Sequence, residues 1–351
     1  MVHAAVDHVL VGRAATNLPS YLDALARDDG YGEVPGLIHR VGGEVVRNAP
    51  APDDGSIPDP LPARDLLPND RYYSHLTQRR HYTVLLTSRG CPFGCTFCAM
   101  ARTRYHPLPV EEVVDEMQSC VDDLGIHEFD MFDPILLHDK NRIVDMCSEI
   151  VRRKLDVEWA CRSRIDHVDE RVLAAAHDAG CRRIYFGIES GDPDVLRRIN
   201  KSVTPEQVRR AIDMTRHHGI HPLGFFQIGS PGETRATARR TIRFALDLPL
   251  DYAQFMRTIA KPGSSLEKTV IETTGRDHWR EYVMGRRDDS RLPSPWTGLD
   301  PAEIDSLVRE AYLRFYMRPR IAGRTLLGSR SAGEVLRYMG VGLAMLLKRS
   351  G

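Results

Sequence analysis

The stretch Ser88-Arg89-Gly90-Cys91-Pro92-Phe93-Gly94-Cys95-Thr96-Phe97-Cys98 places three cysteines within eight residues. A [4Fe-4S] cluster normally takes one thiolate on each of its four irons. Because no fourth cysteine follows nearby, Cys91, Cys95 and Cys98 would leave one iron without a protein ligand. The spacing therefore predicts one [4Fe-4S] cluster whose open iron can bind and reduce a second molecule.

A structural zinc site is the alternative for the same three cysteines. Such a site needs four Cys or His ligands in a closed tetrahedral shell. The nearest candidate for the fourth ligand is His106, which lies beyond a segment of helical pattern. The cysteines alone leave this choice open, and the surrounding motifs favour the cluster.

Composition indicates a folded protein of a reducing compartment. The chain has 351 residues, 42% of them hydrophobic, and seven cysteines of which four are scattered singly. The first ten residues lack an apolar run of signal-peptide length, and no stretch reaches the roughly 18 apolar residues of a membrane span. We therefore expect a cytoplasmic protein. Because 48 basic and 48 acidic residues balance, we expect no nucleic-acid partner.

From about residue 80, short apolar segments alternate with amphipathic helical patterns, which predicts parallel strands joined by helices. Helix starts such as Pro109-Val110-Glu111-Glu112 and helix stops at Gly180 and Gly219 separate the segments. The predicted strands are His81 to Thr87, His127 to Asp133, Val157 to Arg164, Arg182 to Glu189, Pro222 to Gly229 and Tyr252 to Thr258. The three-cysteine motif follows the first strand.

Four segments are expected along the chain. Residues 1–53 contain a strand, a helix and a hairpin that turns at Gly42-Gly43, and residues 54–79 form a proline-rich linker. Residues 80–290 form the strand–helix core. Residues 291–351 form a helical extension, with helices from Pro301 to Met317 and from about Ala332 to Lys348.

Several motifs together resemble the radical S-adenosylmethionine (SAM) enzymes, and more closely their subgroup with an N-terminal cobalamin-binding domain. Besides the cysteines, the motifs are Gly187-Ile188-Glu189-Ser190-Gly191, Gly229-Ser230-Pro231-Gly232-Glu233-Thr234 and Phe315-Tyr316-Met317-Arg318-Pro319-Arg320. The resemblance runs from about residue 5 to the end. It implies a partial (β/α)6 TIM-like barrel in an α/β chain, with the active site at the carboxyl ends of the strands.

The resemblance implies two cofactors, a [4Fe-4S] cluster and SAM, which is cleaved to a 5'-deoxyadenosyl radical by an electron from an external flavodoxin- or ferredoxin-type donor. A complete cobalamin domain takes on the order of 120 residues, whereas about 50 precede the linker here. What remains resembles a truncated cobalamin domain, and Gly12-Arg13-Ala14-Ala15 replaces the usual Gly-Glu-Gly-Glu. Cobalamin is therefore an alternative third cofactor.

The resemblance also assigns SAM contacts. Phe97 would pack near the adenine, and Gly229 and Pro231 would form the turn beneath it. Glu189 and Ser190 would bind the ribose hydroxyls or the methionine part, because the flanking glycines let the backbone approach a ligand closely.

Two charged residues at strand ends are further candidates for SAM binding. Asp133 could accept hydrogen bonds from the SAM ammonium or ribose, or could serve only the turn. Arg164 could hold the SAM carboxylate or an anionic substrate in a bidentate grip, or could pair with Asp166. Strand parity and position near strand ends suggest that Tyr185, Gln227 and Arg257 face the barrel interior and touch a small-molecule substrate.

These features predict a radical SAM enzyme that abstracts hydrogen from a small-metabolite carbon in natural-product biosynthesis. Dehydration, epimerisation, oxidation or cyclisation would follow directly from the substrate radical. The alternatives are cobalamin-dependent C-methylation, a non-catalytic partner of another radical enzyme, and tRNA modification, which the zero net charge disfavours.

Overall fold

The computed structural model describes residues 6–12, 14–50, 61–72, 74, 76–79, 81–286, 294–319, 321 and 323. The predicted helix from Ala332 to Lys348 and most of the proline-rich linker lie outside the described residues. The chain divides into two compact units, Met1–Leu67 with Asp277–Ser290, and Pro68–Arg276 with Arg291–Gly351. The four segments expected from the sequence stay a prediction.

The smaller unit contains a three-stranded sheet in the order β1-β2-β3, which pairs antiparallel. Its core consists of Ala24, Val34 and Leu37. The predicted strand, helix and hairpin near the N-terminus are confirmed. The elements are β1 Val9–Leu10, α1 Ala14–Arg27, β2 Leu37–Val41, β3 Glu44–Arg47 and α9 His278–Val283.

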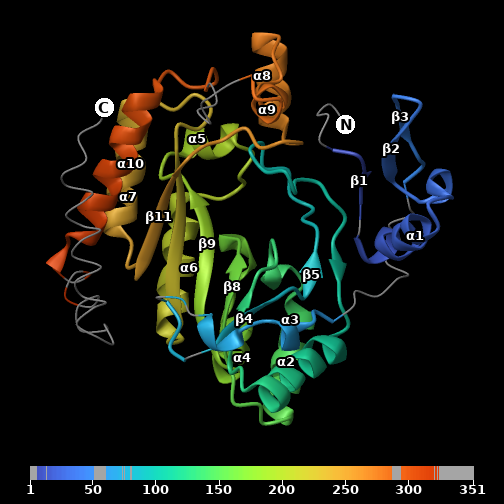
Figure 1. Cartoon of the computed structure of the whole chain (residues 1–351). Coiled ribbons are helices and arrows are strands. Elements are labelled where there is room, and N and C mark those ends of the chain that lie inside the picture. Colours follow the sequence, from blue (N-terminus) through green and yellow to red (C-terminus); the bar gives the residue numbers. More distant parts are fainter. Residues whose placement is uncertain are drawn as a thin grey trace. The chain divides into compact units, whose positions relative to one another are not determined.

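The larger unit contains the predicted six-stranded parallel sheet, in the order β11-β10-β9-β8-β7-β4 (Figure 1). The strands are β4 Tyr82–Leu85, β7 Glu128–Met131, β8 Glu158–Ser163, β9 Cys181–Glu189, β10 His221–Ile228 and β11 Tyr252–Arg257. Each lies within three residues of its predicted bounds. The sheet confirms a partial (β/α)6 TIM-like barrel.

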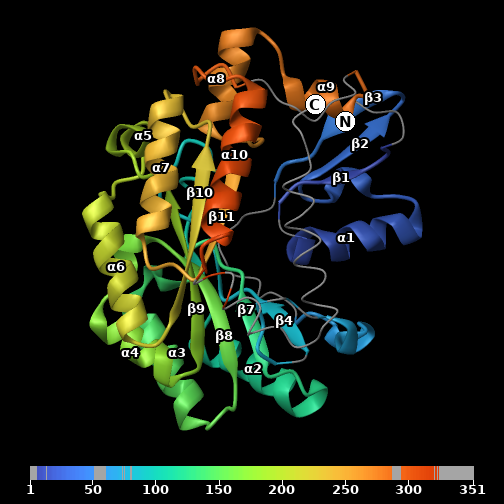
Figure 2. The same ribbon diagram turned by 90° about the vertical axis from the view of Figure 1, so that its left-hand side faces the viewer.

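Helices cover the outer face of this sheet, and α7 and α10 lie side by side (Figure 2). The helices of this unit are α2 Val110–Leu124, α3 Lys140–Arg152, α4 Glu170–Asp178, α5 Pro193–Arg198, α6 Pro205–His217, α7 Arg235–Asp247, α8 Ser265–Thr274 and α10 Pro301–Tyr316. Capping boxes at Thr204, Thr234 and Asp300 begin three of them. None of the described helices is long and apolar enough to cross a membrane.

The helix α10 covers the outer edge of the sheet at β11. Tyr312 and Tyr316 accept the backbone N–H groups of Phe255 and Ala253, and Tyr316 donates to the Ala253 carbonyl at 2.8 Å. These phenol groups form hydrogen bonds with backbone groups that would be unpaired at an open sheet edge. The predicted helix from Pro301 to Met317 is thus confirmed, and it packs against the edge of the sheet.

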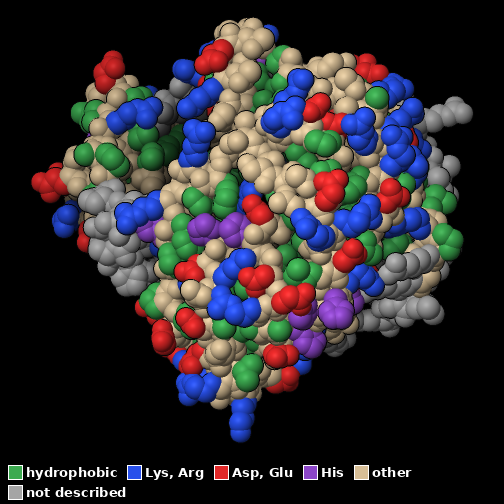
Figure 3. Space-filling model, turned by 180° about the vertical axis from the view of Figure 1, so that it is seen from behind, with side chains coloured by type: hydrophobic (Ala, Val, Ile, Leu, Met, Phe, Trp, Pro, Cys, Tyr) green, Lys and Arg blue, Asp and Glu red, His purple; other side chains and the backbone are tan. Residues whose placement is uncertain are grey.

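The two faces of the sheet differ in chemistry. Side chains such as Phe129, Trp159 and Phe186 are buried in the core beneath the helices. The inner face carries polar and aromatic side chains instead, among them Arg162 and Tyr185. On the outside of the molecule, acidic and basic side chains lie interspersed over the face in Figure 3, in keeping with the zero net charge.

Candidate active site

The three-cysteine segment forms a loop that leaves the carboxyl end of β4 and is closed by a two-stranded ribbon, β5 Ser88–Arg89 with β6 His106–Pro107. Thr103 fastens the loop at Cys91. Its backbone N–H donates to the Cys91 carbonyl at 3.0 Å, and its hydroxyl accepts the Cys91 N–H at 2.9 Å. The sequence reasoning missed Thr103, because it belongs to no motif.

Two glycines allow this loop to close. Gly90 has φ +77°, and a Cβ at this position would overlap the carbonyl oxygen of Arg104. A Cβ at Gly94 would lie 2.7 Å from Nδ2 of Asn200, which donates to the Gly94 carbonyl at 2.8 Å. The loop therefore requires glycine at position 90, whereas a side chain at position 94 would require Asn200 to shift from its contact.

The three cysteines form a donor set that fits an iron–sulfur cluster. Cys91, Cys95 and Cys98 are partly exposed and free of disulfides, whereas the other four cysteines of the chain are buried. Among the described residues, no three Cys, His, Asp or Glu side chains converge on a point that could hold one metal ion. In a cubane each thiolate binds a different iron, so three thiolates on one loop need not converge in this way.

The environment of the thiols contains two buried cations. Burial raises the pKa of the Cys95 thiol, and the charge of Lys201, followed by that of Arg164, opposes this increase. Burial also raises the pKa of Cys91, and the same two cations oppose it. Arg164 and Lys201 thus favour the thiolate form, which is the form that binds metal.

Asp133 follows β7 and braces the start of the cysteine loop. Its carboxylate accepts the Thr87 backbone N–H at 2.8 Å, the Thr87 hydroxyl at 2.8 Å and the hydroxyl of Ser88. Burial raises the pKa of Asp133, although these hydrogen bonds oppose the increase. The expected contact of Asp133 with SAM stays a prediction, because the described contacts of its carboxylate are all with the loop.

Arg142 of α3 completes this brace and was missed by the sequence reasoning. The guanidinium donates to the Thr87 carbonyl at 2.8 Å and to the Leu108 carbonyl at 2.9 Å. It therefore joins the two ends of the ribbon-closed loop. The only signal in the sequence is the helical spacing that places Arg142 on the same face as the apolar residues Met146 and Ile150.

Arg164 lies at the end of β8 and touches the cysteine loop. Its guanidinium stacks on the ring of Phe93 at 4.0 Å and binds Asp166 in a bidentate ion pair at 2.8 and 2.9 Å. The pairing with Asp166 was the alternative expected from the sequence, and a role in holding a carboxylate stays a prediction. His138 and His167 pack edge-on against the same Phe93 ring.

Glu189 ends β9 in a left-handed conformation, φ +69°, which is unusual for a residue other than glycine. Its carboxylate accepts Lys201 Nζ at 3.2 Å and Gln227 Nε2 at 2.9 Å. The absent side chain of Gly187 leaves the room that this pair occupies. The structure thus brings together Glu189 and Gln227, both predicted, with Lys201, which no motif indicated.

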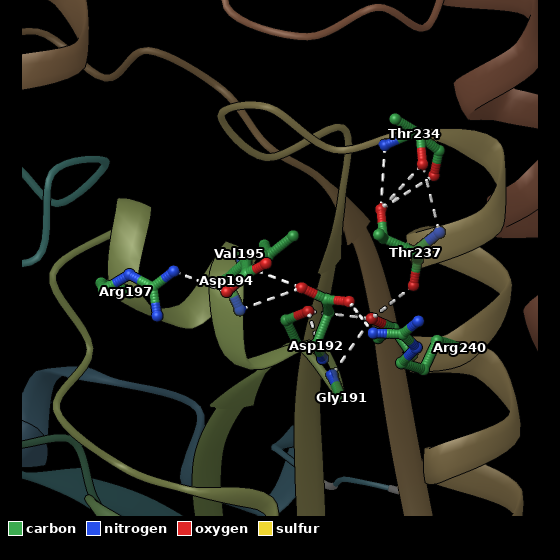
Figure 4. Close-up of polar contacts among 10 residues, drawn as sticks. Gly191, Asp192, Asp194, Val195, Arg197, Thr234, Thr237 and Arg240 are labelled. Atoms are coloured by element: carbon green, nitrogen blue, oxygen red, sulfur yellow. Dashed lines mark hydrogen bonds and ion pairs between the residues drawn. The ribbon is translucent and has the colours of Figure 1, made fainter.

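Ser190 and its neighbours hold the turn after β9 against α7. The Ser190 hydroxyl lies 2.9 Å from that of Thr241, and the next residues continue into α5. Asp192 caps α5 through the N–H groups of Asp194 and Val195 and pairs with Arg240 of α7 at 2.5 Å (Figure 4). Ser190 is fully buried in these contacts, and its expected contact with SAM stays a prediction.

The turn after β10 is organised by Glu233. Its carboxylate accepts the N–H groups of Gly229 at 2.5 Å and Ser230 at 3.2 Å, while its other oxygen, Oε1, is buried without a described partner. Trp296 donates from its indole to the Gly229 carbonyl at 2.8 Å. Pro231 lies within this turn, so the predicted Gly229–Pro231 segment ends at the same edge of the sheet as Glu189.

Phe97 is half-buried and packs against both the barrel core and a small cluster that contains Leu266 and Trp296. The position joins the cysteine loop to the segment after β11. Its expected contact with adenine stays a prediction.

The inner face beneath the loop is lined by stacked groups. Arg162 pairs with Asp130 at 2.6 Å and lies over the rings of Phe132 at 3.8 Å and Tyr185 at 5.0 Å. Tyr185 in turn stacks on Phe225, with ring centroids 5.7 Å apart. Tyr185 thus shares one face of the sheet with Arg162 and Phe225, and its contact with substrate stays a prediction.

The predicted inward position of Arg257 is wrong. Its guanidinium donates to the Pro301 carbonyl at 2.8 Å and lies 3.5 Å from Asp305, both of α10. Arg257 shares strand parity with Phe255, which packs against Tyr312 of the same helix. Arg257 therefore faces the helical layer and not the barrel interior.

A pocket of about 400 Å3 lies between α5 and α6. Its walls include Arg197, Asn200, Lys201 and Thr204. Because Lys201 also binds Glu189 and Asn200 also binds Gly94, this pocket borders the cysteine loop and the end of β9.

Comparison with known proteins identifies the family of this arrangement. Residues 85–245 match the Radical SAM superfamily. An uncharacterized methyltransferase of Pyrococcus horikoshii is 33% identical over 331 residues, which cover 90% of this chain and 68% of that protein. The chain belongs to the radical SAM superfamily. Members of this superfamily use a [4Fe-4S] cluster, SAM and an external electron donor.

More distant relatives share parts of this chain. The anaerobic magnesium-protoporphyrin IX monomethyl ester cyclase of Rubrivivax gelatinosus is 27% identical over 249 residues, 70% of this chain and 44% of the cyclase. Among solved structures, the cobalamin-dependent radical enzyme OxsB has a TM-score of 0.68 at 17% identity, covering 97% of this chain and 55% of OxsB.

The radical SAM methyltransferase TsrM from Kitasatospora setae has a TM-score of 0.63 at 20% identity, covering 76% of this chain and 54% of TsrM. OxsB and TsrM thus share the fold with this radical SAM chain. The chain spans about half the length of the cyclase and of both solved chains.

Proposed function

We propose that this radical SAM protein cleaves SAM reductively and abstracts a hydrogen atom from a carbon of a small metabolite held inside the barrel. The observation that carries the proposal is the three-cysteine loop, which follows the carboxyl end of β4 in a sheet whose inner face is lined by Arg162, Tyr185 and Phe225. Barrel enzymes build their active sites at this end.

A bound [4Fe-4S] cluster supplies the electron that breaks the sulfonium bond of SAM to give a 5'-deoxyadenosyl radical. The protein contributes binding and orientation. Cys91, Cys95 and Cys98 would hold three irons, and Glu189 with Lys201 offers a carboxylate and an ammonium for the amino acid part or the ribose of SAM. The inner face then positions the carbon to be attacked.

The substrate is proposed to be a small molecule of natural-product metabolism, converted by dehydration, epimerisation, oxidation or cyclisation. The stacked rings of Tyr185 and Phe225 and the neutralised Arg162–Asp130 pair favour a molecule with a planar or apolar part.

The test is an anaerobic reaction with SAM and dithionite that scores 5'-deoxyadenosine. We expect the wild-type protein to form it and Cys98→Ala to form none. Cys161→Ala is the matched control, because Cys161 is fully buried in the hydrophobic core and is not one of the three loop cysteines. Failure of the reconstituted wild-type protein to cleave SAM would overturn the proposal, unless a second chain restored cleavage, which would indicate a subunit of a larger enzyme.

A second candidate is cobalamin-dependent methyl transfer. It is favoured by the names of the relatives, since the Pyrococcus protein and TsrM are both described as methyltransferases and the TsrM and OxsB structures contain cobalamin. The same assay separates the two, because methyl transfer from SAM yields S-adenosylhomocysteine in addition to 5'-deoxyadenosine. A stoichiometric cobalt content after anaerobic purification with cobalamin would favour this second candidate.

A further inference from the structure

The outer side of the cysteine loop is exposed, in contrast to the braced side that faces the barrel. Pro92, Ala99, Met100, Arg102 and Arg104 are all exposed, and we call these five residues the outer loop face. Met100 is 42% exposed although it is apolar. The face begins one residue after Cys91 and continues directly after Cys98, so it is the exposed part of the loop that carries the three thiols.

The cations of this face are free. Neither Arg102 nor Arg104 makes an ion pair or a side-chain hydrogen bond with any of the described residues, whereas Arg164 and Lys201 on the barrel side are both paired. The Arg102 guanidinium lies beside Gly94, next to Cys95. The cysteine loop thus carries two unneutralised charges on its exposed part.

Arg102 is held in a strained conformation. Its φ is +58°, which a side chain other than glycine, asparagine or aspartate rarely adopts. The backbone there is fixed, because the Arg102 N–H donates to the Phe93 carbonyl at 2.9 Å. The fixed backbone therefore sets where the Arg102 side chain leaves the loop.

We infer that the outer loop face is the docking surface for an acidic one-electron carrier protein. This inference rests on the proposed function, which needs one electron from outside for each SAM cleaved. Arginine and methionine are enriched in protein interfaces, and weak electron-transfer contacts are small and steered by complementary charge. The apolar Met100 with Arg102 and Arg104 beside it matches such a contact.

The electron balance is simple. A flavodoxin hydroquinone bound at this face would lose one electron and become the semiquinone. The [4Fe-4S] cluster that Cys91, Cys95 and Cys98 would hold would supply that electron to SAM, whose C5'–S bond would break to give methionine and a 5'-deoxyadenosyl radical. No other oxidant or reductant is needed.

The experiment compares two reductants on the same reconstituted enzyme. Arg102→Glu/Arg104→Glu is tested with a reduced bacterial flavodoxin and, separately, with dithionite, scoring 5'-deoxyadenosine. We expect the flavodoxin-driven rate to fall about tenfold or more, because the charges oppose the carrier. The dithionite-driven rate should stay within about twofold of wild type, since a small reductant needs no docking surface.

Binding provides a second readout that is independent of turnover. The dissociation constant of oxidised flavodoxin for the wild-type protein should rise with salt between about 50 and 500 mM, and the doubly reversed variant should lose this dependence. Arg243→Glu is the matched control, because Arg243 is exposed on α7 without a described ion pair and should change neither readout. Arg102→Lys/Arg104→Lys should retain both.

The outcomes separate the two proposals. Absence of 5'-deoxyadenosine with dithionite in the wild-type protein would contradict the proposed function. Normal dithionite activity together with unchanged flavodoxin activity and affinity in the charge-reversed variant would overturn the docking surface alone. A loss of the dithionite reaction in Arg102→Glu/Arg104→Glu, together with a reduced iron content in Arg102→Lys/Arg104→Lys, would show that the two arginines stabilise the loop. This result would refute the docking surface.

Discussion

The ammonium of Lys201 lies 3.2 Å from a carboxylate oxygen of Glu189, and both side chains are more than nine-tenths buried. Removing one partner of such a pair leaves an uncompensated charge, which costs about 3 kcal/mol. We therefore expect Lys201→Met to lower the free energy of unfolding by that amount in a urea titration of the cluster-free protein.

Two comparisons test the cause of this loss. In Lys201→Met/Glu189→Gln the remaining carboxylate is neutralised, so the double variant should be more stable than Lys201→Met alone. Arg197→Met breaks an exposed pair with Asp194 and should leave the urea midpoint unchanged. Equal losses in Lys201→Met and in the double variant would mean that packing, and not charge, explains the effect.

A second prediction concerns Gly90. Alanine at this position would strain the backbone at φ +77° and overlap the Arg104 carbonyl, so the cysteine loop could not close on its ribbon. We expect Gly90→Ala to bind markedly less iron and sulfide per chain after anaerobic reconstitution. Gly263→Ala is the matched control, because Gly263 has φ +83° and open space around it, so only a strain of about 1 kcal/mol remains. Equal iron loading of both variants would contradict the argument.

The strand pattern was readable because its residues alternate between two environments. Trp159 and Cys161 of β8 and Phe186 of β9 lie in the core beneath the helices, whereas Arg162 and Tyr185 of the same strands lie on the opposite face, so apolar periodicity located each strand. The same reasoning placed Arg257 wrongly. Its nearness to a strand end suggested an inward side chain, whereas its parity with Phe255 directs it to α10, since a shift of one residue exchanges the faces.

A third prediction concerns Thr103. Its hydroxyl accepts the Cys91 N–H at 2.9 Å and donates to the Met100 carbonyl at 2.7 Å. Thr103→Val keeps the shape of the side chain and removes both bonds, at a cost of about 1 kcal/mol. We expect the reconstituted variant to lose its cluster to an iron chelator about fivefold faster, followed by absorbance.

Thr269→Val serves as its control. Thr269 makes a hydrogen bond to the Ser265 carbonyl on the exposed side of α8, and its loss should not change the rate. A chelation rate in Thr103→Val equal to that of wild type would show that the loop is held without this residue.

The cysteines could be found from their spacing, but their supports could not. Arg142 lies about 50 residues along the chain from Cys91 and binds backbone carbonyl groups. Every residue has such a carbonyl, so the sequence does not show which of them Arg142 binds. Lys201 meets Glu189 only because α5 returns the chain to the end of β9. Such contacts depend on tertiary geometry, so motif reasoning predicts the ligands of a site better than the residues that position them.

The last prediction concerns Glu233, whose carboxyl is fully buried with one oxygen unpartnered among the described residues. Burial raises its pKa from 4.5 to about 7, against the opposing hydrogen bonds from Gly229 and Ser230. Between these two pH values the folded state binds a proton that the unfolded state has released. The stability that this carboxyl contributes is therefore complete below pH 4.5 and is lost as the pH rises through 7, by about 3 kcal/mol in total. Glu233→Gln resembles the protonated form and cannot titrate, so the difference in unfolding free energy between wild type and Glu233→Gln should shift by this amount between pH 4.5 and 8 in urea titrations. A difference that stays constant over this range would show that Glu233 is ionised throughout, with its charge compensated by the two N–H groups.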